Sequence, residues 1–266
     1  MITSTSNSRI KQIRKLSSHK ERLQTGSFFV EGLRIVGEAF EQNAQFECLI
    51  YSPDLLSSEF GWKIVQHFKK NGMEVLETSE EVFKSISTKD GPQGLAAVLS
   101  QKKQSIQRLS LQKGDLWIAL DSIQDPGNLG TILRTSDAVG GKGLILLDQS
   151  TDPYSVAATR ASMGALFSQN IIPANFVEFK EWKRENQIAV IATSDAAELD
   201  YQQFSYPDPM ILLMGSERQG LHPEYYELCD AIVRIPMAGR SDSLNLAIAT
   251  GVTLYEIFNQ RRARSV

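Results

Sequence analysis

The stretch MILLMGSERQGL, residues 210–221, joins an apolar run to a polar loop, and AIVRIPMAGRSDSLNLAIATGVTLYEI, residues 231–257, repeats that arrangement. Each apolar run has the length of a buried strand, and it breaks into a polar loop at Gly215 or at Pro236. In α/β proteins, ligands bind at the loops that follow parallel strands. These stretches therefore predict a small-molecule site at one edge of an α/β sheet.

The same alternation of short apolar runs with segments of helical periodicity begins at residue 116. The predicted strands are residues 116–121, 143–148, 170–174, 187–194, 210–215 and 231–236. The predicted helices are residues 128–139, 155–167, 177–186 and 244–260. A strand, a helix and a second strand at this spacing indicate a parallel crossover. The fold class is therefore α/β, with a mostly parallel sheet and helices on both faces.

The first hundred residues show a smaller α/β pattern of their own. Its predicted helices are residues 7–23, 31–41, 61–70 and 81–86, and its predicted strands are residues 46–52, 73–78 and 94–100. Residues 102–115 are polar and weakly patterned, as is typical of a linker. We therefore expect an N-terminal domain over residues 1–101 and a second domain over residues 116–266.

Composition limits the class of protein. A chain of 266 residues that is 42% hydrophobic can bury the cores of two modest domains. Its two cysteines, Cys48 and Cys229, lie far apart, which favours a reducing compartment and predicts neither a disulfide framework nor a metal site. The N-terminus has no apolar signal core, and no run approaches the roughly 20 apolar residues of a membrane span. We expect a cytoplasmic protein.

The net charge of −3 conceals a basic N-terminal segment. Residues 1–23 carry six lysines and arginines against the single acid Glu21, and residues 261–264 add three arginines. Such ends suit contacts with phosphate groups, although solvated basic tails are an equally good explanation of the charge alone. The candidate phosphate contacts are Arg9, Lys11, Arg14 and Lys15.

The loop after residues 116–121 carries a further signal. Helical spacing places Asn128 and Gly130 at the start of a helix and Arg134 one to two turns later. An asparagine there can cap the helix, and free amides near Gly127 can accept an anion. A capped helix with a surface arginine is the simpler alternative. No G-x-G-x-x-G and no P-loop sequence is present, so a dinucleotide site is not indicated.

Three segments taken together carry a family resemblance. They are N-x-G-x-x-x-R at residues 128–134, G-x-E-x-x-G-L at residues 215–221, and I-P-M with S-L-N at residues 235–237 and 243–245. In order and separation they resemble the motifs of the SpoU-type (TrmH family) RNA ribose 2′-O-methyltransferases of the SPOUT superfamily. The departures are minor: Ser216, Arg218 and Leu246 stand where Asn, Gly and Val are usual.

The N-terminal part is similar to the accessory substrate-binding domain of that family, which is related to ribosomal proteins that bind kinked RNA. The similarity lies in the segments SRIKQIRKL, residues 8–16, and FFVEGLRIV, residues 28–36. It implies an RNA partner for the basic N-terminal residues. It also favours large-subunit ribosomal RNA as the substrate, because relatives that act on tRNA often lack such a domain.

The resemblance also implies a trefoil knot in the C-terminal domain, against the general rule that chains do not knot. S-adenosylmethionine would bind within the knot loops, largely through backbone groups. The residues implied in cofactor binding are Thr193, Ser194, Asp195, Met214, Gly215, Gly220, Ile235, Met237, Ser243 and Leu244.

The implied chemistry is methyl transfer from a sulfonium to a ribose hydroxyl, which must be oriented and stabilised as an alkoxide. Arg134 is the implied catalytic residue. Because a guanidinium stays protonated, we expect it to clamp an RNA phosphate while that phosphate or water takes the proton. Asn128 would fix Arg134 or the ribose, and Glu217 would orient the loop or the guanidinium. Ser243 and Asn245 would hold the catalytic loop and the nucleotide.

Simpler roles exist for some of these residues. Glu217 is otherwise a surface acid, and Ser243 and Asn245 are otherwise caps of the last helix. Arg160 stands where the family often carries a substrate-facing arginine, and we expect it to contact RNA less directly than Arg134.

Alternative functions are a tRNA ribose 2′-O-methyltransferase, a noncatalytic RNA-binding protein that retains the fold, and a nucleotide-dependent oxidoreductase. The second would be favoured by loss of Arg134 or of the S-L-N segment, and both are present. The third needs a glycine fingerprint that the chain lacks. The resemblance further implies a homodimer through the C-terminal domain, and the apolar content of residues 244–258 suits one.

Overall fold

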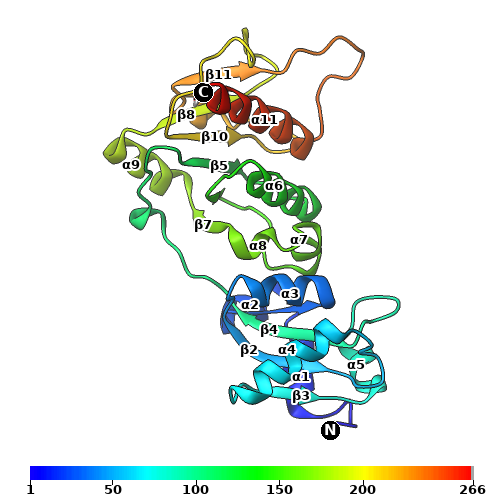
Figure 1. Cartoon of the computed structure of the whole chain (residues 1–266). Coiled ribbons are helices and arrows are strands. Elements are labelled where there is room, and N and C mark those ends of the chain that lie inside the picture. Colours follow the sequence, from blue (N-terminus) through cyan, green and yellow to red (C-terminus); the bar gives the residue numbers. More distant parts are fainter. Residues whose placement is uncertain (265–266) are drawn as a thin grey trace. The chain divides into compact units, whose positions relative to one another are not determined.

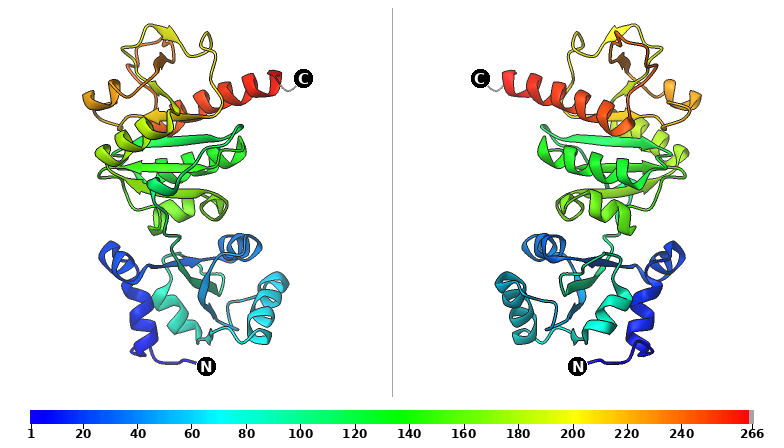
Figure 2. Two further views of the ribbon diagram at one scale, coloured as in Figure 1. Left: turned by 90° about the vertical axis from the view of Figure 1, so that its left-hand side faces the viewer. Right: turned by 90° about the vertical axis from the view of Figure 1, so that its right-hand side faces the viewer.

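The computed structural model describes residues 1–264, which form two compact units (Figures 1 and 2). Unit 1 comprises Met1–Gln101 and Tyr154–Phe167, and unit 2 comprises Lys102–Pro153 and residues 168–264. The helical segment near Arg160 therefore packs with the N-terminal residues, although the sequence places it among the strands of the C-terminal domain. Residues 102–115, which the sequence indicates as a linker, are part of unit 2.

Unit 1 is built on a four-stranded mixed sheet in the order β1-β4-β2-β3 (Figure 1). The strands are β1 Ser27–Glu31, β2 Phe46–Tyr51, β3 Val75–Glu77 and β4 Leu95–Ser100. The helices are α1 Ser8–Lys15, α2 His19–Thr25, α3 Leu33–Glu41, α4 Glu59–Lys70, α5 Glu80–Ile86, α7 Val156–Ala161 and the first residues of α8 Ala165–Ser168. Strand β4 runs antiparallel to β1 and β2, and β2 runs parallel to β3.

The N-terminal helix that the sequence predicts over residues 7–23 is divided into α1 and α2. Buried Arg22, which is 4% exposed, donates hydrogen bonds to the carbonyls of Leu16 and Ser17 at 2.7 and 2.9 Å. These carbonyls lie at the end of α1, where a helix leaves acceptors unsatisfied. Arg22 therefore stabilises the break between the helices and does not belong to the exposed basic surface.

The predicted helix over residues 155–167 is also broken. Between α7 and α8, Met163 and Gly164 adopt φ angles of 53° and 103°. A side chain at Gly164 would come within 2.7 Å of Glu38. The left-handed backbone at these two residues follows the end of α7 at Ala161, and Gly164 lies against Glu38 of α3. The ring of Tyr154, whose centroid lies 4.7 Å from that of Phe28, packs the start of the segment in the same unit.

Unit 2 contains a seven-stranded sheet whose neighbouring strands are all parallel, which confirms the predicted α/β class with a mostly parallel sheet. Its strands are β5 Leu116–Asp121, β6 Gly143–Leu147, β7 Asn170–Ala174, β8 Ala189–Thr193, β9 Leu199–Asp200, β10 Met210–Met214 and β11 Ala231–Arg234. Its helices are the 3-10 turn η1 Ile106–Arg108, α6 Pro126–Ala138, α9 Phe176–Asn186, α10 Pro223–Tyr226 and α11 Leu246–Arg264.

Helices cover both faces of this sheet (Figure 2). On one face, Trp117 and Ile211 pack with Phe179 of α9 and with Ile106 of η1. On the other face, α6 and α11 pack against each other. No helix in the part of the chain that the structure describes is long and apolar enough to cross a membrane.

The strand order, β7-β6-β5-β10-β8-β11-β9, positions the candidate site. Strand β10 lies between β5 and β8, and β11 lies on the far side of β8. Because all four strands are parallel, their carboxyl ends lie at one edge, as the pairing of Leu120 with Met214 and of Val233 with Thr193 shows. The loops that follow these strands therefore meet at that edge.

Candidate functional site

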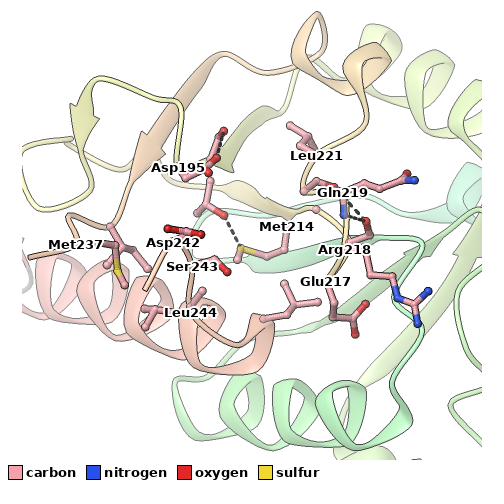
Figure 3. A pocket seen from close by; sticks show the side chains of 18 of the residues that line it. Asp195, Met214, Glu217, Arg218, Gln219, Leu221, Met237, Asp242, Ser243 and Leu244 are labelled. Carbon is pink, nitrogen blue, oxygen red and sulfur yellow. Dashed lines mark hydrogen bonds between the residues drawn. The ribbon is translucent and has the colours of Figure 1, made fainter. Parts of the chain in front are cut away.

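The loops after β8, β10 and β11 and the first turn of α11 enclose a cavity of about 370 Å³ (Figure 3). Every residue that the sequence implicates in cofactor binding lines it. These are Thr193, Ser194, Asp195, Met214, Gly215, Gly220, Ile235, Met237, Ser243 and Leu244. The structure thus gathers residues from three separate segments around a single ligand-sized space.

The loop after β10 can close only because residue 215 is glycine. A Cβ atom on Gly215 would lie 2.2 Å from the backbone of both Gly220 and Leu221. The loop is cross-linked by reciprocal hydrogen bonds between the backbones of Ser216 and Gly220, at 2.8 and 3.1 Å. Gly220 has a φ of 67°, which residues with a side chain rarely adopt. The polar loop is therefore a tight turn folded onto the end of its own strand.

The loop after β11 has a different character. Within the chain that the structure describes, no amide or carbonyl of residues 235–244 bonds to another backbone group. Ile235, Met237, Ser243 and Leu244 of this loop line the cavity. Its main-chain donors and acceptors are consequently available to a ligand.

Several cavity residues were not expected from the sequence. Arg218, Gln219, Asp242 and Tyr226 also line the space. The hydroxyl of Tyr226 lies 3.1 Å from that of Ser194, which links α10 to the end of β8. Tyr226 sits in a four-residue helix, too short to give a periodic signal. Asp242 directly precedes the S-L-N segment, and this position next to the motif was the sequence signal that could have identified it.

Glu217 lies between the loop after β10 and the loop after β5. Its carboxylate accepts hydrogen bonds from the backbone amides of Gln124 and Asp125, each at 3.2 Å. It also accepts one from the side chain of Asn128, again at 3.2 Å. The anion that binds next to the start of α6 is thus the protein's own Glu217.

Asn245 completes a chain of side-chain hydrogen bonds. Its Nδ2 donates to Oδ1 of Asn128 at 3.0 Å, while its own Oδ1 accepts from the amide of Ala247 at 2.9 Å. Asn245 therefore caps α11, which is its simpler role, and it also contacts the first turn of α6. The expectation that Asn245 holds the nucleotide stays a prediction. The chain Asn245–Asn128–Glu217 joins the three sequence motifs.

One expectation about the start of α6 was wrong. The cap is Asp125, whose side chain accepts from the amide of Asn128 at 2.7 Å, because the helix begins at Pro126 rather than at Asn128. The side-chain hydrogen bonds of Asn128 go to Glu217 and Asn245 and not to Arg134, and the expectation that Asn128 fixes the ribose stays a prediction.

Arg134 lies on the exposed side of α6 and lines neither the cavity nor the adjoining depression that contains Asn128, Glu217, Ser243 and Asn245. Among residues 1–264 it has no hydrogen-bond or ion-pair partner. Its guanidinium is therefore free to bind an anionic ligand.

The predicted basic contacts of unit 1 differ in how they are engaged. Arg9 forms an ion pair with Glu74 at 2.6 Å, and this hydrogen bond raises the pKa of Arg9. Arg14 donates to the carbonyl and hydroxyl of Ser85 at 3.2 and 2.9 Å. Lys11 and Lys15 are exposed and have no such partner among the described residues.

Arg160 belongs to unit 1, where it donates to the hydroxyl of Thr88 at 2.7 Å. It is absent from the residues that line the cavity and the depression beside it. The expectation that Arg160 contacts RNA stays a prediction.

Comparison with known proteins agrees with this architecture. Residues 115–255 match the SpoU rRNA Methylase family, and residues 7–97 match the MRM3-like substrate binding domain. The chain is similar to the 23S rRNA guanosine 2′-O-methyltransferase RlmP of Bacillus subtilis, with 26% identity over 96% of this chain and 98% of that one. It is also similar to a 23S rRNA uridine 2′-O-methyltransferase of Streptomyces viridochromogenes, with 29% identity over 92% and 87%.

Among solved structures, the AdoMet-bound rRNA methyltransferase of Sinorhizobium meliloti matches with a TM-score of 0.89 and 40% identity, over 98% of this chain and 97% of that one. The family match covers more than half of the 266 residues and includes all three motifs. The chain therefore belongs to the SpoU rRNA methylase family.

Proposed function

We propose that this protein transfers a methyl group from S-adenosylmethionine to a ribose 2′-hydroxyl of large-subunit ribosomal RNA. The observation that carries the proposal is the chain Asn245–Asn128–Glu217, which joins all three family motifs beside the cavity. The relatives named above act on 23S rRNA, and the S. meliloti enzyme was crystallised with AdoMet.

The cavity suits S-adenosylmethionine chemically. Met214, Ile235 and Leu244 offer apolar contacts for an adenine ring, while the unpaired backbone of residues 235–244 can hydrogen-bond to its edge. Asp195 and Asp242, both labelled in Figure 3, can accept hydrogen bonds from ribose hydroxyls or from an ammonium group. When bound, the cofactor supplies an electrophilic methyl group on a sulfonium.

The chain's own residues prepare the nucleophile. Arg134 binds an RNA phosphate and stabilises negative charge on the 2′-oxygen, whose proton passes to that phosphate or to water. Glu217 fixes the loop after β5 and the side chain of Asn128 at the start of α6, and Asn245 ties Asn128 to the start of α11. Ser243, which lines both the cavity and the depression, orients the ribose. These roles correspond to positioning and electrostatic stabilisation.

RNA contacts from unit 1 are a second part of the proposal. Lys11 and Lys15 supply unpaired charge, whereas Arg9 and Arg14 contribute less because Glu74 and Ser85 already engage them. A cytoplasmic location follows from the proposed substrate.

Dimer formation and knotting are also proposed. A stripe of side chains on α11, made of Ile248, Val252 and Tyr255, recurs at helical spacing, and Ile248 and Tyr255 are 56% and 49% exposed. Such a stripe supports a two-fold interface. The insertion of β10 between β5 and β8 supports a C-terminal trefoil knot. Light scattering at micromolar concentration tests the dimer, and a uniform monomer would contradict it.

Calorimetry tests the cofactor directly. Titration with S-adenosylmethionine should give saturable binding and raise the melting temperature, whereas NAD should do neither. Binding of NAD without binding of S-adenosylmethionine would overturn the proposal.

A further inference from the structure

The cavity and the depression beside it have one wall in common. This wall includes residues 216–219 of the loop after β10 and Ser243 and Leu244 of the loop after β11, and we call it the shared rim. In the proposed reaction, the sulfonium in the cavity must face a ribose that enters the depression. The sulfur of S-adenosylmethionine is therefore expected to lie near the shared rim.

The amino-acid end of the cofactor follows from this placement. A short saturated chain joins the sulfur to the α-carbon, which bears an ammonium group and a carboxylate. The carboxylate consequently lies within reach of a long side chain on the shared rim. Arg218 and Gln219 are the long side chains of the rim that could donate hydrogen bonds to it.

The charged side chains that line the cavity are mostly acidic. They are Asp195, Glu217 and Asp242, against Arg218 as the single cation of the lining that the structure describes. Nearby negative charges repel a carboxylate, whereas a nearby cation stabilises it. A ligand that carries a carboxylate is therefore best accommodated next to Arg218.

The guanidinium of Arg218 is available for this contact. The residue is exposed, and among residues 1–264 its side chain has no hydrogen-bond or ion-pair partner. The adjacent carboxylate of Glu217 does not engage it, because Glu217 accepts instead from two backbone amides of the loop after β5 and from the side chain of Asn128. Arg218 thus retains its full donor capacity for a ligand.

The acids and the cation lie at different sides of the cavity. Figure 3 shows Asp195 and Asp242 on one side of Met214, and Glu217 and Arg218 on the other. Carboxylates accept hydrogen bonds from ribose hydroxyls, so Asp195 and Asp242 suit the adenosine part of the cofactor. The charge distribution therefore matches a ligand that has hydroxyls at one end and a carboxylate at the other.

We infer that Arg218 binds the α-carboxylate of S-adenosylmethionine and selects a ligand with an intact amino-acid end. The inference rests on the proposed function for the identity of the ligand. The planar fork of a guanidinium matches the two oxygens of a carboxylate. Because Arg218 stands where glycine is usual in the family, this contact distinguishes the chain from most of its relatives.

The test removes each partner of the contact in turn. Calorimetry measures how the full-length parent protein and Arg218→Gln bind S-adenosylmethionine and its decarboxylated analogue, which keeps the adenosine, the sulfonium and the amine. Arg218→Gln should weaken binding of S-adenosylmethionine about tenfold or more, because a charge-assisted bidentate contact is lost. It should not weaken binding of the analogue by more than about twofold, since the analogue has no carboxylate to lose.

Matched variants control for charge and for shape. Arg240→Gln removes an exposed cation of the loop after β11 that lines neither the cavity nor the depression. It should leave both affinities within about twofold of the parent. Arg218→Lys keeps the charge without the fork and should retain part of the preference for S-adenosylmethionine. Thermal melting without ligand checks that each variant is folded.

An equal loss for both ligands in Arg218→Gln would overturn the inference, because the side chain would then only support the loop. An unchanged ratio of the two affinities would contradict it too, by leaving the carboxylate to backbone amides. Weaker binding of 23S rRNA with unchanged cofactor affinity would instead place Arg218 on the RNA, against the inference. A parent protein that does not bind S-adenosylmethionine would contradict the proposed function itself, whereas the other outcomes concern Arg218 alone.

Discussion

The side-chain amide of Asn245 donates a hydrogen bond to the side-chain oxygen of Asn128 at 3.0 Å, across 117 positions of the sequence. Asn128 in turn donates to Glu217 at 3.2 Å. The start of α11 is thereby connected to the start of α6 and, through Glu217, to the loop after β10. Order in the loop after β11 and order at the start of α6 should consequently depend on each other.

Exchanging the donor and the acceptor of the hydrogen bond between Asn128 and Glu217 tests the role of this contact. Asn128→Asp should lower kcat about 10–100-fold, because a carboxylate would then face the carboxylate of Glu217 without a donor between them. Such an unsatisfied contact costs about 1–3 kcal/mol. Adding Glu217→Gln places an amide donor opposite the introduced carboxylate and should recover part of the loss. Single-turnover methylation and urea unfolding measure both effects. Strictly additive losses would show that the two side chains do not act through their contact.

Arg134 should be essential for transfer and dispensable for cofactor binding. Arg134→Ala should abolish methylation while changing the S-adenosylmethionine affinity less than about twofold, because the side chain does not line the cavity. Arg134→Lys should also be severely impaired, since lysine lacks the bidentate fork. Arg184→Ala, at an exposed position of α9, is the control and should be fully active. Substantial turnover by the alanine variant would remove Arg134 from the mechanism.

Gly215 offers a steric test of the cavity. Gly215→Ala forces a methyl group against the backbone of Gly220 and Leu221 and should destabilise the loop by about 1–3 kcal/mol, with loss of cofactor binding. Gly239→Ala is the matched control in the neighbouring loop, because a Cβ there meets nothing within 4 Å. Calorimetry measures the affinity of both variants for S-adenosylmethionine, which should fall only in Gly215→Ala. Normal affinity in Gly215→Ala would mean that the loop after β10 does not shape the site.

The buried thiol of Cys48 and the half-buried thiol of Cys229 predict how stability depends on pH. Burial raises the pKa of Cys48 to about 11 and that of Cys229 to about 12. In the unfolded chain both thiols titrate near about 8.5, so the folded state retains more protons above that value. Their contribution is therefore complete below about pH 8.5 and declines as the pH rises toward the folded pKa values.

Urea unfolding at pH 7.5 and pH 10 measures this decline, which we expect to reach up to about 2 kcal/mol per thiol. Cys48→Ala should flatten the dependence, although it also lowers stability at every pH by removing packed atoms. A midpoint that rises between the two pH values would contradict the assignment.

The sequence located most strands of unit 2 because each is a short, fully apolar run bounded by turn residues. Strand β1 was not predicted, since the helical periodicity of α3 extends back to Glu31 in the sequence and only the φ of 112° at Gly32 interrupts it. Gly164, which follows α7, lies against Glu38 of α3, and Glu38 is remote in sequence. Local patterns cannot encode such tertiary contacts.

For the site, motif resemblance identified the side chains, and only the fold could show how they are connected. The bonds from Glu217 to two backbone amides depend on β5 and β10 being neighbours in the sheet. The packing of Arg160 in unit 1 likewise brings it to Thr88, 72 positions away in the sequence. Neither relationship follows from residue spacing.

The most direct test of the central claim is the position of the transferred methyl group. Full-length protein is incubated with tritium-labelled S-adenosylmethionine and 23S rRNA from a strain that lacks the gene, and the RNA is then hydrolysed with alkali and mapped by mass spectrometry. We predict label on one ribose 2′-oxygen, which protects the adjoining phosphodiester bond from alkali. Label on a base, or label on tRNA with none on 23S rRNA, would contradict the account.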